Sequence, residues 1–125
     1  MKLSPPVPEI PVASVETAIA YYVETLGFRQ DWGDEEGGIA GISRDDCRLF
    51  LTNASFRQVI TNPGPIVIWP NLSSCAEVDA LFAEWHAAGA HILSPPADKP
   101  WLLREFLAAD PDGNLLRVFH DFSPK

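Results

Sequence analysis

The histidines and cysteines of this chain are the residues best suited to hold a metal ion, but their spacing does not favour one. No two of the three histidines, His86, His91 and His120, stand four positions apart, the spacing that brings two ligands together on one face of a helix. Neither Cys47 nor Cys75 has a second cysteine three positions away. We therefore interpret the histidines as ordinary surface or half-buried side chains and the cysteines as free thiols.

Three tryptophans offer a different chemistry, the binding of a flat or cationic ligand. Trp32, Trp69 and Trp101 fall on or beside segments predicted to be strands. An indole face stacks on a heteroaromatic ring or lies under a cation, with a gain of about 0.5 to 2 kcal/mol. Packing in the core is the competing explanation for each of them. Trp85 falls on the apolar stripe of a predicted helix, so for this residue we expect burial in the core.

The composition indicates one soluble globular domain over residues 1–125. The 125 residues are 46% hydrophobic and 21% charged, enough to build a core without disulfides. The net charge of −8 argues against a nucleic-acid partner and favours a cationic one, although an acidic surface also serves solubility alone. The acidic turns at residues 34–36 and 45–46 either are solvated loops or attract such a ligand to the rim of a site. No signal peptide is recognisable and no apolar run approaches the roughly 20 residues that span a bilayer, so we expect no membrane partner and a cytoplasmic location.

The first half of the chain, about residues 5–53, is predicted to form a strand, a helix and three further strands. The opening strand, residues 7–12, contains two prolines and therefore belongs at a sheet edge. Ser14 is a typical helix N-cap and Gly27 a typical residue after a helix end, with apolar side chains at three- and four-residue steps between them. The remaining strands are expected at residues 28–32, 39–43 and 48–52.

The same pattern returns in the second half, about residues 66–122, after a connector at residues 54–65. A strand at 66–69 precedes a helix capped by Ser73 or Ser74 and ended by Gly89, and a short strand is expected at 92–93. The turn at Asp110–Asn114 joins a final hairpin of residues 104–109 and 115–120. We predict an α+β fold of two βαβββ modules, in which a mixed sheet curls into a cup with the helices outside and a second copy completes the cavity.

These motifs resemble the vicinal oxygen chelate superfamily of glyoxalases, bleomycin resistance proteins and dioxygenases. The segment 14–28 and the Asp110–Asn114 turn are typical of the whole superfamily. The segments 39–46, 49–52 and 100–106 are more similar to bleomycin resistance proteins. The resemblance implies a homodimer, domain-swapped or side by side, with ligand pockets shared between the subunits.

The resemblance also implies where a metal site would lie in this chain. Metal-dependent members use His, Gln or Glu ligands on facing strands. Here Val7 and Arg117 stand at the first and the closing ligand positions, and the strand at 66–69 contains no His, Gln or Glu. The resemblance therefore implies that the metal site is lost and that no cofactor is bound.

We expect a non-enzymatic binding protein that sequesters a bleomycin-type cationic glycopeptide antibiotic or a related ring-bearing small molecule and so confers resistance. The alternatives are an enzyme of the superfamily, of glyoxalase, dioxygenase or thiol transferase type, with an atypical metal site, and a structural or stress-related protein whose cup binds nothing of consequence. Ile39 stands where bleomycin resistance proteins often carry an aromatic side chain. The residues expected to line the pocket are Trp32, Ile39, Phe50, Thr52, Trp69 and Trp101.

Overall fold

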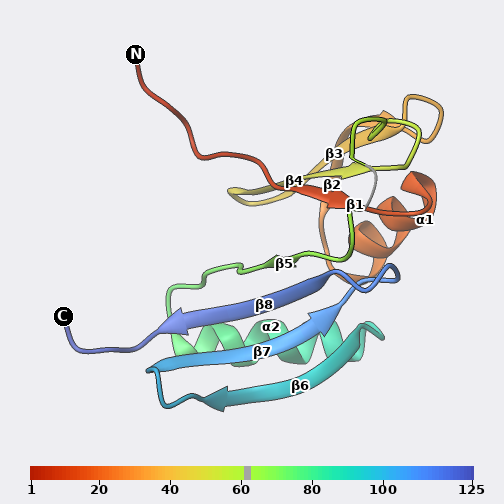
Figure 1. Cartoon of the computed structure of the whole chain (residues 1–125). Helices are drawn as coiled ribbons and strands as arrows, with labels where there is room; N and C mark the ends of the chain where they lie inside the picture. The colour runs from red at the N-terminus through yellow and green to blue at the C-terminus, as the bar shows by residue number, and fades with distance from the viewer. Residues whose placement is uncertain (61–62) are drawn as a thin grey trace.

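The computed structural model describes residues 1–60 and 63–125, so Thr61 and Asn62 of the predicted connector lie outside the described residues. It confirms an α+β fold made of two βαβββ modules (Figure 1). The first module contains β1 (Glu9–Pro11), α1 (Val15–Ala20), the π-helical turn η1 (Tyr21–Thr25), β2 (Arg29–Asp34), β3 (Ile39–Arg44) and β4 (Cys47–Thr52). The second contains β5 (Val67–Ile68), α2 (Cys75–Ala87), β6 (His91–Asp98), β7 (Leu103–Ala109) and β8 (Leu115–Asp121).

Each module forms one four-stranded mixed sheet, and both sheets have the same topology. Sheet A has the order β1-β4-β3-β2 and sheet B the order β5-β8-β7-β6. In each of them the first strand runs parallel to the last strand of its module, and the other pairs are antiparallel. The strands are therefore divided between two separate sheets, and they form no closed barrel in the described part of the chain.

The helix boundaries follow the capping residues that the sequence predicts. The Ser14 side chain accepts a hydrogen bond from the Thr17 amide, and the Ser74 side chain accepts one from the Glu77 amide. Gly27 and Gly89 follow the helices with φ of +76° and +87°, a conformation that costs glycine little. The widening of the first helix into a π-helical turn over Tyr21–Thr25 has no counterpart in the sequence prediction.

Strand β6 is much longer than the predicted strand at residues 92–93. It runs along the edge of sheet B and includes Pro95 and Pro96. The pairing of β6 with β7 shifts register between Ser94 and Ala97, at the two prolines. A strand at a sheet edge with a bulge at its prolines tolerates the missing N–H groups, and the sequence prediction ended the strand too early.

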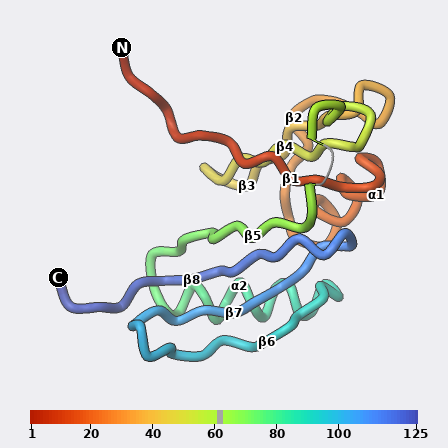
Figure 2. Tube along the Cα trace, in the orientation of Figure 1, coloured from red at the N-terminus to blue at the C-terminus, as the bar shows by residue number. Residues whose placement is uncertain are grey.

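One hydrophobic core joins the two modules, and it lies against the helix-covered faces of both sheets. In Figure 1 sheet B is seen face-on with α2 behind it, whereas sheet A is seen nearly edge-on above it, and Figure 2 follows the same path as a trace. Trp85 is 2% exposed, which confirms its place in the core. The buried side chains of the sheets in this core are Ile10, Ala40, Ile42, Leu49, Leu51, Phe106, Ala108, Leu116 and Val118. Alternate residues on these strands consequently point away from the core, and the two faces they form are called here the open faces of sheets A and B.

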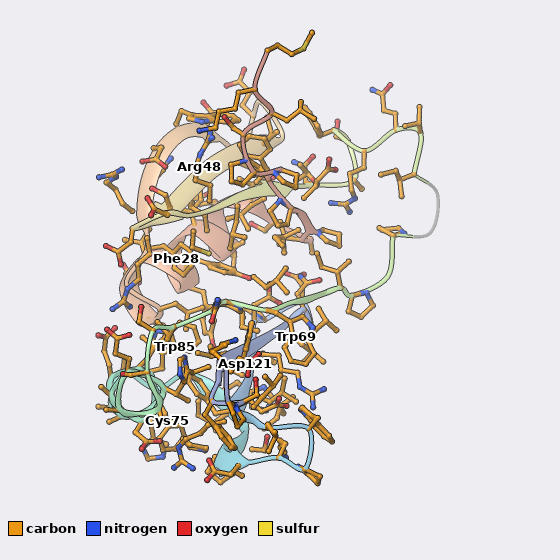
Figure 3. All side chains as sticks on the ribbon, turned by 90° about the vertical axis from the view of Figure 1, so that its left-hand side faces the viewer. Phe28, Arg48, Trp69, Cys75, Trp85 and Asp121 are labelled. Carbon is orange, nitrogen blue, oxygen red and sulfur yellow. The ribbon has the colours of Figure 1, made fainter. Side chains whose placement is uncertain are left out.

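Polar contacts fix the junction between the modules. The Asp110 carboxylate accepts hydrogen bonds from the Tyr22 hydroxyl, from the Asn114 side-chain amide and from two backbone amides of its own turn. The Trp85 indole N–H donates to the Leu26 carbonyl at 3.0 Å, and Figure 3 shows Phe28 of the first module above Trp85 of the second. Burial and the nearby Asp110 carboxylate raise the pKa of Tyr22 far above its usual value, so Tyr22 is a neutral donor.

Replacing Tyr22 tests this junction. We expect Tyr22→Phe to lower the free energy of unfolding by about 2 kcal/mol, because the change keeps the ring but removes a buried donor to a charged acceptor. Urea unfolding followed by circular dichroism measures the loss. The exposed Glu24→Gln on the same helix is the control, with a change below about 0.5 kcal/mol expected. Equal unfolding midpoints for Tyr22→Phe and the natural protein would show that the hydroxyl contributes nothing.

Candidate functional site

An aromatic pair lies on the open face of sheet A. Phe50 on β4 and Trp32 on β2 each pair with Gly41 on the strand between them, so their side chains meet above it. Their ring centroids are 5.3 Å apart with the rings nearly perpendicular, a favourable geometry. The indole lies directly over Gly41, where any Cβ would collide with its Nε1 and Cε2 atoms. Glycine at this position therefore allows the pair to form.

The other two predicted residues of sheet A lie beside this pair but differ in accessibility. Ile39 and Thr52 face each other across β3 and β4, and Ile39 is half-buried. Thr52 is fully buried, and its hydroxyl donates to Glu9 Oε2 at 3.1 Å. The Arg57 guanidinium also donates to the Thr52 carbonyl. In a single chain Thr52 thus holds Glu9 and Arg57 in place and presents no surface of its own.

The open face of sheet B is organised by the β7–β8 turn. Gly113 in that turn has a φ of +82°, and the turn sets a register in which Leu107 pairs with Arg117 and Glu105 pairs with Phe119. Glu105 and Arg117 are therefore diagonal neighbours on one face, within reach of long side chains. Their ion pair joins Arg117 Nε to Glu105 Oε1 at 2.6 Å, and the Glu105 side chain is only 3% exposed.

Two indoles flank this ion pair. The Arg117 guanidinium carbon lies 4.7 Å from the Trp69 ring centroid and 6.0 Å from that of Trp101. Trp101 sits in the turn between β6 and β7, and its indole N–H donates to Glu105 Oε2 at 3.1 Å. One carboxylate therefore binds both Arg117 and Trp101. The ring of Phe119 packs edge-on against Trp69 with centroids 5.6 Å apart.

The three tryptophans predicted to line a pocket are accessible to a ligand. Trp32 is 43% exposed, Trp69 45% and Trp101 54%, unusually high values for the largest apolar side chain. In Figure 3 Trp69 lies on the side of sheet B opposite α2 and Trp85. The six predicted residues form two groups, four of them on sheet A and two on sheet B. The single chain does not bring the two groups together, because the helix-covered faces of both sheets are turned to the shared core.

The sequence prediction of the pocket omitted Glu105, Arg117 and Gly41. In the sequence, Arg117 stands at an expected metal position, and Glu105 lies within the motif at residues 100–106. Side chains alternate between the two faces along β7 and β8, and the length of the turn sets the register of the two strands. Together these two features place Glu105 and Arg117 on one face, so their pairing could have been predicted from the sequence. The role of Gly41 depends on the position of an indole from a different strand, which no local pattern reveals.

The residues at the expected metal positions do not fit a metal ion. Arg117 is a cation already paired with Glu105, and Val7 is an apolar residue that precedes β1. No group of three or more His, Cys, Asp or Glu side chains within residues 1–60 and 63–125 is arranged to hold a metal.

Cys47 and Cys75 are free and half-buried, and burial raises the pKa of the Cys47 thiol. Over residues 1–60 and 63–125, no helix has the length and apolar character needed to cross a membrane.

A separate cleft of about 560 Å³ lies between α2 and the β3–β4 turn. Asp45 and Asp46 line it together with Glu77 and Glu84. Arg44 forms a bidentate ion pair with Glu84 at 2.6 and 3.0 Å. The acidic turn at residues 45–46 thus borders this cleft and not the aromatic faces.

Comparison with known proteins decides the family. The sequence model of the Glyoxalase/Bleomycin resistance protein/Dioxygenase superfamily matches residues 6–118. The chain belongs to this superfamily. No curated protein is significantly similar to it in sequence.

Several solved structures share the fold of this chain. A bleomycin-binding protein from bleomycin-producing Streptomyces verticillus, solved with copper(II)-bleomycin, is 28% identical with a TM-score of 0.73, over 94% of this chain and 96% of that one. A glyoxalase/bleomycin resistance protein/dioxygenase from Nocardioides is 23% identical with a TM-score of 0.78, over 99% and 89% of the two chains. TioX from Micromonospora sp. ML1 is 23% identical with a TM-score of 0.75, over 95% and 100%.

The close approach of Trp32 to Gly41 can be tested by adding one methyl group. We expect Gly41→Ala to displace the indole from Phe50 and shift the indole N–H resonance of Trp32 in an NMR spectrum. Stability should fall by only about 1 kcal/mol, because a half-exposed side chain can move away. Trp32→Phe assigns the resonance. An unchanged Trp32 signal in Gly41→Ala would contradict the packing described above.

Proposed function

We propose that this protein is a non-enzymatic binding protein that sequesters a cationic, ring-bearing small molecule of the bleomycin type. The observation that carries the proposal is the exposure of three tryptophans on the open faces of the sheets, where each offers a stacking surface. The unsuitability of Val7 and Arg117 as metal ligands supports binding over metal-dependent catalysis. The bleomycin-binding protein from Streptomyces verticillus shows that this fold accommodates such a ligand.

The pocket is proposed to lie between two copies of the chain. The open faces of sheets A and B point away from the shared core, and their tryptophans are 43 to 54% exposed. Exposed apolar patches of this kind are typical of interaction sites. A two-fold dimer that sets sheet A of one copy opposite sheet B of the other would make two equal pockets, each with aromatic side chains on both walls.

Charge supports a cationic ligand. The chain carries a net charge of −8, which raises the local concentration of cations. On sheet A the exposed Glu9 pairs in register with Phe50 and brings a carboxylate next to the aromatic pair. Ile39 provides an aliphatic surface beside them. Binding without turnover would confer resistance by mass action, since it lowers the concentration of free antibiotic.

Calorimetry with copper(II)-bleomycin tests the ligand. We expect a dissociation constant in the micromolar range or below, and Trp101→Ala should weaken binding about tenfold through the loss of one stacking surface. Trp101→Phe, which keeps a ring, should weaken it less. Absence of binding by the natural protein at micromolar concentration would rule out a bleomycin-type ligand, and equal affinities for all three proteins would rule out the role of Trp101.

Mixing two variants that each bind weakly tests the shared pocket. Trp32→Ala damages the sheet A wall and Trp69→Ala the sheet B wall, so neither homodimer keeps an intact pocket. When the two proteins are unfolded, mixed in equal amounts and refolded, about one quarter of the pockets should be intact, because half of the dimers are mixed and each has one undamaged pocket. Titration of the refolded mixture measures this fraction as sites with the affinity of the natural protein. A mixture without such sites would show that each pocket uses a single chain, and a monomer in sedimentation would contradict the dimer.

A further inference from the structure

We propose that Arg117 binds a carboxylate, or a similar planar pair of oxygen acceptors, attached to the aromatic ring of the ligand. This inference rests on the proposed function, because it specifies the ligand chemistry of the sheet B wall of the same pocket. It assigns a function to the positive charge of Arg117, which stands at the expected closing position of a metal site. The ligand would therefore combine a carboxylate at its ring with a cationic group near Glu9 on the sheet A wall.

The orientation of the Arg117 guanidinium is set from three sides. Its Nε atom is held by Glu105 Oε1 at 2.6 Å, and its central carbon lies 4.7 Å from the Trp69 ring centroid and 6.0 Å from that of Trp101. Glu105 itself cannot turn away easily, because its second oxygen accepts the Trp101 indole N–H at 3.1 Å and the side chain is 3% exposed. The planar group is thus preorganised before any ligand arrives.

The remaining donors of Arg117 are available to a ligand. Neither Nη atom has a hydrogen-bond partner among residues 1–60 and 63–125, whereas the Nε atom is used by Glu105. The side chain is 33% exposed, and neither Nη atom is buried without a partner, so both reach solvent. Two adjacent N–H groups in one plane match the two oxygens of a carboxylate, which a lysine ammonium cannot reproduce.

The two tryptophans determine what such a carboxylate must be attached to. Since both indoles lie close to the guanidinium, a group that binds the Nη atoms also comes near their exposed rings. An aromatic carboxylate satisfies both features at once, with its oxygens on Arg117 and its ring against the exposed indoles, which are 45% and 54% accessible. A purely cationic ring would stack on the indoles but meet Arg117 with charge of the same sign.

Two naphthalene compounds that carry charged groups of opposite sign test the inference. We expect 2-naphthoate to bind the natural protein about tenfold more tightly than 2-naphthylmethylammonium, as measured by calorimetry. Binding should shift the indole N–H resonances of Trp69 and Trp101, which Trp→Phe variants assign. Equal affinities, or a preference for the ammonium compound, would overturn the inference.

Arg117→Lys is the decisive variant. It keeps a positive charge for the buried Glu105 but loses the planar pair of donors, so 2-naphthoate should bind about tenfold more weakly while 2-naphthylmethylammonium changes less than about twofold. Arg48→Lys is the matched control, because Arg48 lies 6.0 Å from the Phe50 ring on sheet A and should leave the preference unchanged. If Arg48→Lys abolishes the preference and Arg117→Lys does not, the anchor is on sheet A and the inference is wrong.

A double variant keeps the test valid if Arg117→Lys is unstable. Glu105→Gln combined with Arg117→Gln replaces the ion pair by two neutral amides, and the preference for the carboxylate should disappear.

The results with copper(II)-bleomycin and with 2-naphthoate distinguish this inference from the proposed function. Binding of copper(II)-bleomycin without any preference for 2-naphthoate would overturn the inference and leave the proposed function intact. A preference that depends on Arg117, without binding of copper(II)-bleomycin, would support the inference and overturn the proposed ligand.

Discussion

The structure depends most on the carboxylate of Asp110, which accepts four hydrogen bonds within the junction of the two modules. Two of them close the β7–β8 turn, and one comes from Tyr22 of the first module. Asn114 in the same turn donates to the Pro11 carbonyl and accepts from the Ile66 amide, so the ends of β1 and β5 meet here. A buried carboxylate is favourable only when it is saturated in this way, which makes the turn intolerant of change.

The shared core decides where a ligand can bind. Both sheets use their helix-covered faces to build one core, and the opposite faces lie outside it. The exposed tryptophans are the consequence. The same arrangement that stabilises the chain therefore places the two proposed walls of the pocket on separate faces, and for this reason the pocket is proposed to form between two copies.

The Glu105–Arg117 pair illustrates how stability and function share one set of contacts. A carboxylate that is 3% exposed requires a partner, and Arg117 and the Trp101 indole supply it. These contacts also orient the guanidinium and fix the indole in the β6–β7 turn. The positive charge on this face of sheet B therefore belongs to a side chain whose position is set by its own partners.

The sequence by itself determined the features that depend on neighbouring residues. Ser14 and Gly27 define the first helix through local hydrogen bonds and a positive φ, and the Asp110–Asn114 turn likewise depends on its own side chains. Only the tertiary structure decided which strand faces are covered, because burial depends on elements far apart in the chain. For this reason the burial of Thr52 and the meeting of Trp101 with Glu105 could not be derived from local pattern, although the tryptophans themselves could be identified as ligand-binding candidates.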